Sequence, residues 1–179
     1  EGFGVYIYAG GASYRGDWVN DMKEGVGEFR WEDGACYQGK WASNLRNGHG
    51  TYIYADGDVY EGNWEDDVQH GKGIYKFYNG DVYTGDYVVG ERTGYGIMIT
   101  AGGNRYEGQF FKGEQHGKGV YTWQHGAVYD GEWMNGRREG NGKYTWSNGD
   151  TYEGQWKSGL MNGEGILRLS DGSKFKGVF

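Results

Sequence analysis

One sequence pattern recurs through this chain at a constant interval. Tyr-x-Gly-x-aromatic, or its Phe variant, occurs eight times, as YRGDW, YQGKW, YEGNW, YTGDY, YEGQF, YDGEW, YEGQW and FKGVF, with a step of 23 residues. A Gly-x-Gly follows eleven residues after each of the first seven starts. A fixed period without insertions predicts a repeat architecture in which every repeat is one supersecondary unit and buries its apolar face against its neighbours.

The repeat boundaries follow from the residue that opens each motif. Repeats start near residues 14, 37, 60, 83, 106, 129 and 152, residues 1–13 form a partial repeat, and residues 175–179 form a terminal half-repeat. We therefore expect one array over residues 1–179, as part of a longer chain. The alternative is that another chain covers the terminal strand edges, for example a second copy in a homodimer through a terminal repeat.

Each repeat shows the alternation of two β-strands. In Tyr60–Trp64 the Tyr, Gly and Trp fall on one strand face, and in Gly73–Phe77 the Gly, Tyr and Phe do the same. We expect a polar loop over Glu65–Gly71 between these strands, and type I′ turns at dipeptides such as Asp56-Gly57. The predicted fold is all-β: an elongated single-layer antiparallel meander of stacked 23-residue hairpins, a solenoid-like rod.

The composition agrees with a core built from rings and glycines. The chain has 38 Gly, 32 aromatic residues and no Pro, and four columns of the repeat hold 32 of the glycines. Another four columns hold 28 of the aromatic residues on one sheet face, which predicts a mainly structural aromatic ladder. Any ligand role falls to rings left incompletely covered. The candidate aromatic groove is one of these columns: Trp18, Trp41, Trp64, Tyr87, Phe110, Trp133 and Trp156.

Charge and cysteine content narrow the class of protein. A formal net charge of −7 argues against nucleic-acid binding and disfavours a polybasic lipid-binding surface. The single cysteine, Cys36, favours a reducing, cytoplasmic setting. The four histidines are His49, His70, His116 and His125. Three of them lie beside the Gly-x-Gly motif, which indicates positions of the repeat and no catalytic arrangement. We therefore expect no enzyme, no cofactor and no metal site; the alternative is zinc bound by Cys36 with nearby histidines.

The repeat resembles a known family at these residues. Tyr-x-Gly-x-Trp, a short polar segment and His/Asn-Gly-x-Gly, as in YEGNWEDDVQHGKGIY and YEGQFFKGEQHGKGVY, are similar to the MORN (membrane occupation and recognition nexus) repeat. The resemblance covers the whole chain. It implies a single-sheet hairpin array without a cofactor or catalysis, found in cytoskeletal scaffolds, ciliary spokes, membrane tethers and appendages of larger enzymes. It also implies acidic phospholipids as an alternative ligand.

Two groups of residues depart from the repeat pattern. Apolar residues gather in and around the repeat that starts at residue 83, which indicates either a partner-binding surface or sequence drift: Val82, Val88, Val89, Ile97, Ile99, Phe111 and Val120. Basic residues gather toward the C-terminal end and are the candidates for a lipid site: Arg137, Arg138, Lys157, Arg168, Lys174 and Lys176.

These observations favour a non-catalytic scaffold that binds proteins in a cytoskeletal, ciliary or membrane-associated assembly. We expect a helix or strand of a partner protein along the aromatic groove or on the apolar residues. The alternatives are an acidic-phospholipid-binding tether and the regulatory region of a larger enzyme.

Overall fold

The computed structural model describes all 179 residues. The chain divides into two compact units, Glu1–Glu91 (unit 1) and Arg92–Phe179 (unit 2), and each is described by itself. Both consist of β-strands and turns only. No helical segment long and apolar enough to cross a membrane is present.

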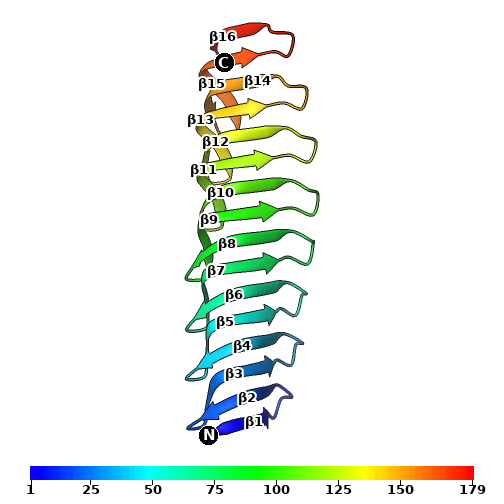
Figure 1. Cartoon of the computed structure of the whole chain (residues 1–179), viewed down its shortest axis with the longest axis vertical. Helices are drawn as coiled ribbons and strands as arrows, with labels where there is room; N and C mark the ends of the chain where they lie inside the picture. The colour runs from blue at the N-terminus through cyan, green and yellow to red at the C-terminus, as the bar shows by residue number, and fades with distance from the viewer. The chain divides into compact units, whose positions relative to one another are not determined.

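Unit 1 is a meander in which each strand pairs antiparallel with the next one along the chain (Figure 1). Its strands are β1 (Gly2–Ile7), β2 (Ser13–Val19), β3 (Met22–Arg30), β4 (Cys36–Ala42), β5 (Leu45–Ile53), β6 (Val59–Glu65), β7 (Val68–Lys76) and β8 (Val82–Val88). The predicted single-layer antiparallel meander of hairpins is confirmed in this unit.

Unit 2 repeats the same plan. Its strands are β9 (Glu91–Ile99), β10 (Arg105–Phe111), β11 (Glu114–Thr122), β12 (Val128–Met134), β13 (Arg137–Thr145), β14 (Thr151–Lys157), β15 (Leu160–Arg168) and β16 (Lys174–Val178). The first residue of β9 is the last residue of unit 1.

The predicted loop between the two strands of a repeat is wrong. β6 runs to Glu65 and β7 begins at Val68, so only Asp66 and Asp67 connect them, where a loop over Glu65–Gly71 was expected. Both connecting residues have positive φ, 45° and 68°, which is the geometry of a type I′ hairpin turn. The strands can continue because a β-bulge between Gly62 and Trp64 absorbs the residues that looked like loop.

The type I′ turns are therefore at the other end of the hairpin from the predicted Asp-Gly sites. At Asp56-Gly57 only Gly57 has positive φ, 94°, and its N–H donates to the carbonyl of Tyr54 at 3.0 Å. Tyr54 N–H in turn donates to Asp58 O at 2.9 Å. This is a three-residue connection, a type I turn followed by a left-handed glycine, so the glycine was correctly read as a turn residue but assigned the wrong turn type.

The bulge explains why a tyrosine opens every repeat. A bulge leaves backbone groups outside the ladder, and an unpaired buried carbonyl is costly. Tyr60 Oη donates to Asn63 O at 2.9 Å, within the bulge. The same hydroxyl-to-carbonyl bond, three residues along, forms from Tyr14, Tyr37, Tyr83, Tyr106, Tyr129 and Tyr152.

These tyrosines are the centre of the core. All seven are at most 1 % exposed. The ring of Tyr60 lies over Gly73, where an added Cβ would come within 2.5 Å of the hydroxyl oxygen, so the position admits only glycine. Each ring also meets the aromatic side chain four residues along edge to face, as Tyr60 meets Trp64 with centroids 5.1 Å apart. Tyrosine and glycine columns are thus one packing unit.

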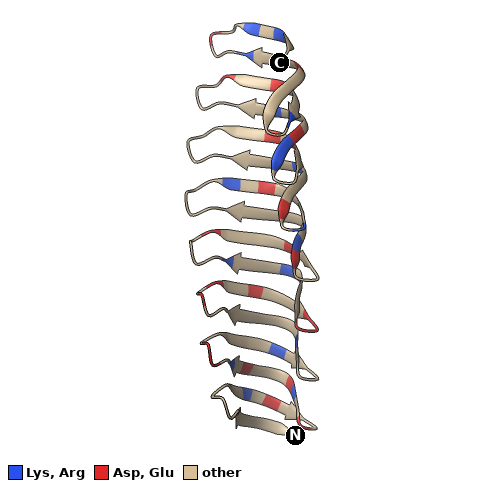
Figure 2. Ribbon diagram, turned by 180° about the vertical axis from the view of Figure 1, so that it is seen from behind, with Lys and Arg blue, Asp and Glu red and all other residues tan.

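The two units differ in charge. Unit 1 carries 7 Lys and Arg against 16 Asp and Glu, a formal charge of −9, whereas unit 2 carries 11 against 9, a formal charge of +2. Figure 2 shows acidic residues in the turns at both ends of the unit 1 hairpins. The negative net charge of the chain therefore comes from unit 1, and unit 2 is slightly positive.

Candidate functional site

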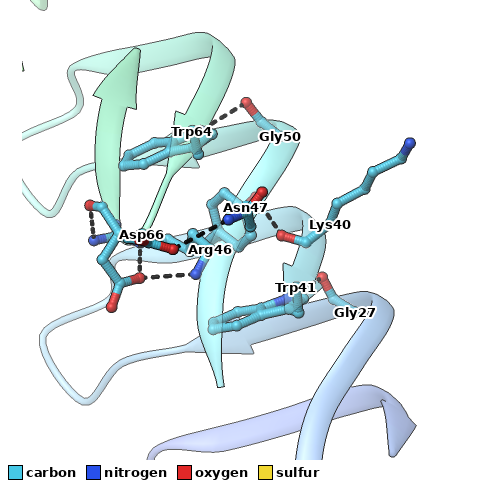
Figure 3. Close-up of polar contacts among 10 residues, drawn as sticks. Gly27, Lys40, Trp41, Arg46, Asn47, Gly50, Trp64 and Asp66 are labelled. Carbon is cyan, nitrogen blue, oxygen red and sulfur yellow. Dashed lines mark hydrogen bonds and ion pairs between the residues drawn. The ribbon is translucent and has the colours of Figure 1, made fainter. Parts of the chain in front are cut away.

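The predicted aromatic groove is not an open surface. Trp41, Trp64, Trp133 and Trp156 are buried, as are Tyr87 and Phe110 in the same column, and Trp18 is half-buried. The indole N–H of each buried tryptophan donates to a glycine carbonyl fourteen residues earlier, as Trp64 Nε1 does to Gly50 O at 3.2 Å. Figure 3 shows this bond for Trp41 and Trp64. The buried rings of this column are therefore part of the core.

Rings at the end of the second strand of each repeat are less covered. Trp31, Trp123 and Trp146 are half-buried on the aromatic face. Trp123 packs on Tyr121 and Tyr144 at centroid distances of 4.5 and 5.2 Å, so one part of its ring contacts the core. Their indole N–H groups make no hydrogen bond within the protein. This column, and not the predicted one, presents aromatic surface and free donors to a ligand.

A long cationic side chain lies over the rings in several repeats, at positions one repeat apart. Arg46 Cζ lies 4.3 Å from the ring centroid of Trp64, and Lys23 Nζ lies 4.3 Å from that of Trp41. Burial against these rings lowers the pKa of Lys23. We call the site over the rings at this position of the repeat the cation slot. The residues at this position are 23, 46, 69, 92, 115, 138 and 161. A cation over an aromatic face is attracted by the ring quadrupole.

In unit 1 the turn of the next hairpin closes the slot. Asp67, the second residue of the β6–β7 turn, accepts hydrogen bonds at Oδ1 from the backbone N and the Nε of Arg46, both at 2.9 Å. Arg46 also donates from Nη2 to Asp67 O at 2.9 Å. Figure 3 shows Arg46 between Trp41 and Trp64, beside the turn residue Asp66. Asn44 occupies the equivalent turn position beside Lys23, and its Oδ1 accepts a hydrogen bond from the backbone N of Lys23 at 2.8 Å. The half-buried guanidinium therefore has its counter-charge inside the chain.

In unit 2 the equivalent slot of Arg138 lacks that carboxylate. Arg138 Cζ lies 4.4 Å from the Trp156 ring centroid, and its Nη2 donates to Gly159 O at 2.6 Å, as Arg46 does to Asp67 O. Gly159 occupies the repeat position that Asp67 has four repeats earlier, so the turn offers no side-chain acceptor, and Arg138 forms no salt bridge. Burial against the rings lowers the pKa of Arg138.

A pocket of about 270 Å³ opens beside this arginine. It is lined by the rings of Tyr144, Trp146 and Trp156 and by Leu160 and Met161, with Arg138 and Gly159 completing the wall. Leu160 and Met161 are exposed. The pocket thus combines an apolar lining with one guanidinium.

The predicted apolar residues are divided between the two units. Val82, Val88 and Val89 belong to unit 1, and the others belong to unit 2. Within unit 2, Ile97 and Val120 both pair with Glu107, which stands between them, and Ile99 pairs with Arg105. Arg105 Nη2 contacts Glu107 Oε2 at 2.5 Å, and this pair interrupts the apolar surface.

Exposure also varies among these apolar residues. Val88, Val89, Ile99 and Phe111 are exposed, whereas Val82, Ile97 and Val120 are half-buried. Phe111 packs beside His116 with ring centroids 5.5 Å apart, away from the ladder position of Ile97. The residues of unit 2 therefore form separate small contacts, and one continuous surface is not built from them.

The predicted basic residues do not form one cluster either. Arg138 lies among the rings of the aromatic face. Arg168 pairs with Lys174 across strands β15 and β16, and its Nη1 contacts Glu153 Oε2 at 3.5 Å. Lys176 pairs with Ile166, and Arg137 and Lys157 flank two different two-residue turns. No shared headgroup site emerges from them.

Titratable groups elsewhere pair locally. Tyr95 Oη and Arg105 both donate to Glu107, and these bonds lower the pKa of Glu107. Burial raises the pKa of the free thiol of Cys36. No group of three or more His, Cys, Asp or Glu side chains is placed to hold a metal ion.

The cation slot was missed in the sequence, although a signal was present. Lys23, Arg46, Arg92 and Arg138 are separated by multiples of 23 residues, and glutamine stands at two of the positions between them. Asp67 and Gly159 also occupy one position of the repeat. Only the fold shows that this position faces the slot of the preceding repeat, since the two residues are 21 apart in the chain.

Comparisons with known proteins agree with this architecture. A search of curated proteins found no significant match. Among solved structures, the TCP domain of SAS-4 (dCPAP) from Drosophila melanogaster, in complex with a proline-rich motif of Ana2 (dSTIL), is similar with a TM-score of 0.55 at 12 % identity, over 99 % of this chain and 90 % of that one. The TCP10c domain of Drosophila melanogaster Sas-4 gives 0.50 at 12 % identity, over 99 % of both chains. At such identities the likeness concerns the fold alone.

The family assignment comes from the sequence profile of the MORN repeat. It matches eight consecutive segments, 1–13, 14–36, 37–59, 60–82, 83–105, 106–128, 129–151 and 152–174. The tyrosine hydroxyl bond described above recurs in seven of these segments. The bulge and its paired glycines recur in six strand pairs. The chain therefore belongs to the MORN repeat family.

Proposed function

We propose that this chain is a non-catalytic scaffold that binds segments of partner proteins on its aromatic face, within a cytoskeletal, ciliary or membrane-associated assembly. One observation carries the proposal: the half-buried column that includes Trp31, Trp123 and Trp146 offers ring surface and indole donors that the fold does not use. Aromatic side chains with one apolar and one polar edge are enriched at protein interfaces.

The spacing of the column suits an extended ligand. Trp123 and Trp146 occupy the same position in successive hairpins, and two strands advance a sheet by about 9.6 Å. Three residues of an extended or polyproline II segment span about 9–10 Å. Every third residue of such a segment therefore meets an equivalent ring. A sheet of this fold was solved with a protein segment, the proline-rich motif of Ana2 on SAS-4.

The buried polar groups support a structural and binding role over catalysis. The tyrosine hydroxyls and indole N–H groups of the core donate to backbone carbonyls in repeat after repeat. These bonds stabilise the sheet. The indole N–H groups that the fold does not use, those of Trp31, Trp123 and Trp146, lie on the aromatic face, where a partner can reach them. Lipid binding through basic residues is the weaker candidate because those residues are dispersed.

The test compares two faces of the same protein. The immobilised full chain is incubated with cell extract, and captured proteins are quantified at low and high salt. The aromatic-face variant is Trp31→Ala/Trp123→Ala/Trp146→Ala, and the opposite-face control is Thr51→Ala/Thr145→Ala/Thr151→Ala, whose positions lie on the other strand face. We expect specific captures that survive high salt and are lost in the aromatic-face variant alone. Equal capture by both variants would contradict the proposal, as would captures that all vanish at high salt.

A further inference from the structure

Arg138 lacks the carboxylate partner that the equivalent arginine of unit 1, Arg46, has in Asp67. Arg46 and Arg138 stack on equivalent tryptophans at 4.3 and 4.4 Å, and both donate from Nη2 to the backbone carbonyl of the second turn residue. The two guanidinium groups therefore share the same stacking and the same backbone acceptor. At the second turn residue the two slots differ in the carboxylate of Asp67, which the sequence replaces by Gly159.

The missing carboxylate leaves a defined set of donors. Asp67 Oδ1 receives two hydrogen bonds, from the backbone N and from Nε of Arg46. The Nε of Arg138 has no acceptor in the chain. Arginine stays charged in proteins, and a half-buried guanidinium without a counter-charge is unfavourable by comparison with a paired one. An anion at the position of the Asp67 carboxylate would relieve this.

The space for such an anion is open. A Cβ added at Gly159 meets no atom within 4 Å, and the adjoining pocket of about 270 Å³ is bounded by Trp146, Leu160 and Met161. A ligand that carries its carboxylate to Arg138 therefore meets apolar surface at once. That combination matches an acidic residue followed or preceded by an apolar one, because the carboxylate and the apolar side chain then lie a few ångströms apart on one strand or turn.

We propose that the Arg138 pocket binds an acidic side chain, Asp or Glu, of a partner protein, with an apolar neighbour of that residue packed against Trp146, Leu160 and Met161. The partner's carboxylate takes the position that Asp67 has beside Arg46. This rests on the proposed function, because the pocket lies on the aromatic face, and it names the chemistry of the partner there. Unit 2 suits an acidic partner better than unit 1, since their formal charges are +2 and −9.

The decisive variant closes the slot from inside. Gly159→Asp introduces at position 159 the residue that position 67 has. The backbone can accept it, because Asp67 adopts a φ of 68° and Gly159 a φ of 86°. Its matched control is Gly136→Asp, at the same turn position one repeat earlier, with a φ of 74° and equally open space. That turn faces Gln115, because Gly136 N donates to Gln115 O, so the control adds the same charge and backbone strain without meeting Arg138.

A second variant removes the cation instead. Arg138→Gln places in the slot the residue that the chain itself has at positions 69 and 115, so folding is expected to be retained. Circular dichroism and thermal melting of all three variants check this before binding is measured.

The ligand is found by selection. A displayed library of random octapeptides is selected on the full-length wild-type chain, and enriched peptides are synthesised with each acidic residue also replaced by its amide. We expect enrichment of Asp or Glu beside apolar residues, and about tenfold or greater loss of affinity in Gly159→Asp, in Arg138→Gln and with the amide peptides. Gly136→Asp should bind within about twofold of the wild type.

The outcomes separate this inference from the proposed function. Enriched peptides that lack acidic residues, or that bind Gly159→Asp as well as wild type, overturn the Arg138 assignment while leaving a peptide-binding aromatic face. A selection that enriches nothing, together with Arg138-dependent binding to phosphatidylserine vesicles, overturns it in favour of a lipid headgroup. If the wild-type chain captures no protein from extract and selects no peptide, both the proposed function and the Arg138 assignment are contradicted.

Discussion

The two-residue turns of unit 1 and unit 2 have the same backbone shape and a different second residue. In unit 1 that residue is Asp21, Asn44 or Asp67 in three of four turns, and in unit 2 it is always glycine. Both choices satisfy the positive φ that a type I′ turn requires. The difference teaches that one turn position has two consequences: it permits the hairpin in every repeat, and its side chain determines whether the neighbouring cation slot is closed from within.

The cores of the two units are alike despite their difference in charge. The buried tyrosine of each repeat, its hydroxyl bond and the paired glycines are the same in both. Changes to the core should therefore affect the two units equally, and changes to the turn or slot should affect them differently. The following predictions test that division, beginning with the largest effect.

Alkaline pH should unfold both units together. Burial raises the pKa of Tyr14 and of Tyr129 to about 12, above the value of about 10 in an unfolded chain. The unfolded state therefore loses its protons first, so stability is full below pH 10 and decreases as the pH rises from about 10 to 12. Tyrosinate absorbance and circular dichroism should report one coincident transition. Two separate transitions would show that the charge of unit 1, and not the shared core, governs alkaline stability.

Alanine at a core glycine should cost about 3 kcal/mol in either unit. A Cβ at Gly62 would approach Gly73 Cα and Tyr60 Oη at 2.6 Å, and one at Gly154 would approach Gly165 Cα and its tyrosine hydroxyl at the same distance. Backbone cannot move away, so the strand pair must separate. Urea denaturation of Gly62→Ala and Gly154→Ala measures the loss.

The control for this pair is Gly102→Ala. Gly102 has an ordinary φ and its added Cβ would meet only Thr100 Oγ1, at 3.8 Å, so the change should lie within about 0.5 kcal/mol of wild type. A loss in one unit alone, or a comparable loss in the control, would break the claim of a shared core.

Phenylalanine at a core tryptophan should cost about 1–2 kcal/mol in each unit. Trp64→Phe and Trp156→Phe keep a ring, as Phe110 shows for this column, but remove the donor to Gly50 O and to Gly142 O. Thermal denaturation should show similar losses, and Tyr78→Phe, on an exposed ring, should show almost none. A much smaller loss for one tryptophan would mean that its carbonyl acceptor finds another donor.

The slot should distinguish the units by about 0.5–1 kcal/mol. Gly159→Asp and Gly136→Asp carry the same backbone strain, and only the former places a carboxylate beside an arginine. Gly159→Asp should therefore be more stable than Gly136→Asp in chemical denaturation, and the difference should disappear when Arg138→Gln is added to both. Equal stability in the arginine background would argue against a slot that accepts a carboxylate.

Opening the slot of unit 1 should have the smallest effect on stability and a specific effect on binding. Asp67→Gly removes the partner of Arg46, a half-exposed pair worth about 0.5 kcal/mol. Isothermal titration with a peptide selected on the wild type should show a second, weaker class of site. Unchanged stoichiometry would mean that the lining of Leu160 and Met161, and not the arginine, defines the ligand site.

Much of the fold followed from the repeat pattern because its signals are local. Period-two alternation in Tyr60–Trp64 assigned the strand and its inward face, and the 23-residue step assigned the meander. The turn assignment failed for an identifiable reason. The segment Glu65–Gly71 is polar and resembles a loop, but a bulge and a two-residue turn accommodate it within extended strands.

The sequence by itself determined the repeat, the hairpins and the family, because tyrosine and glycine at a strict spacing admit few other structures. Only the tertiary structure decided which rings are covered and which cation has a counter-charge. Trp64 and Trp146 are equally aromatic in the sequence, yet one donates to a buried carbonyl and the other borders a pocket. Arg46 and Arg138 differ because residues 21 positions further along the chain fold back beside them, and one of these carries a carboxylate while the other has no side chain.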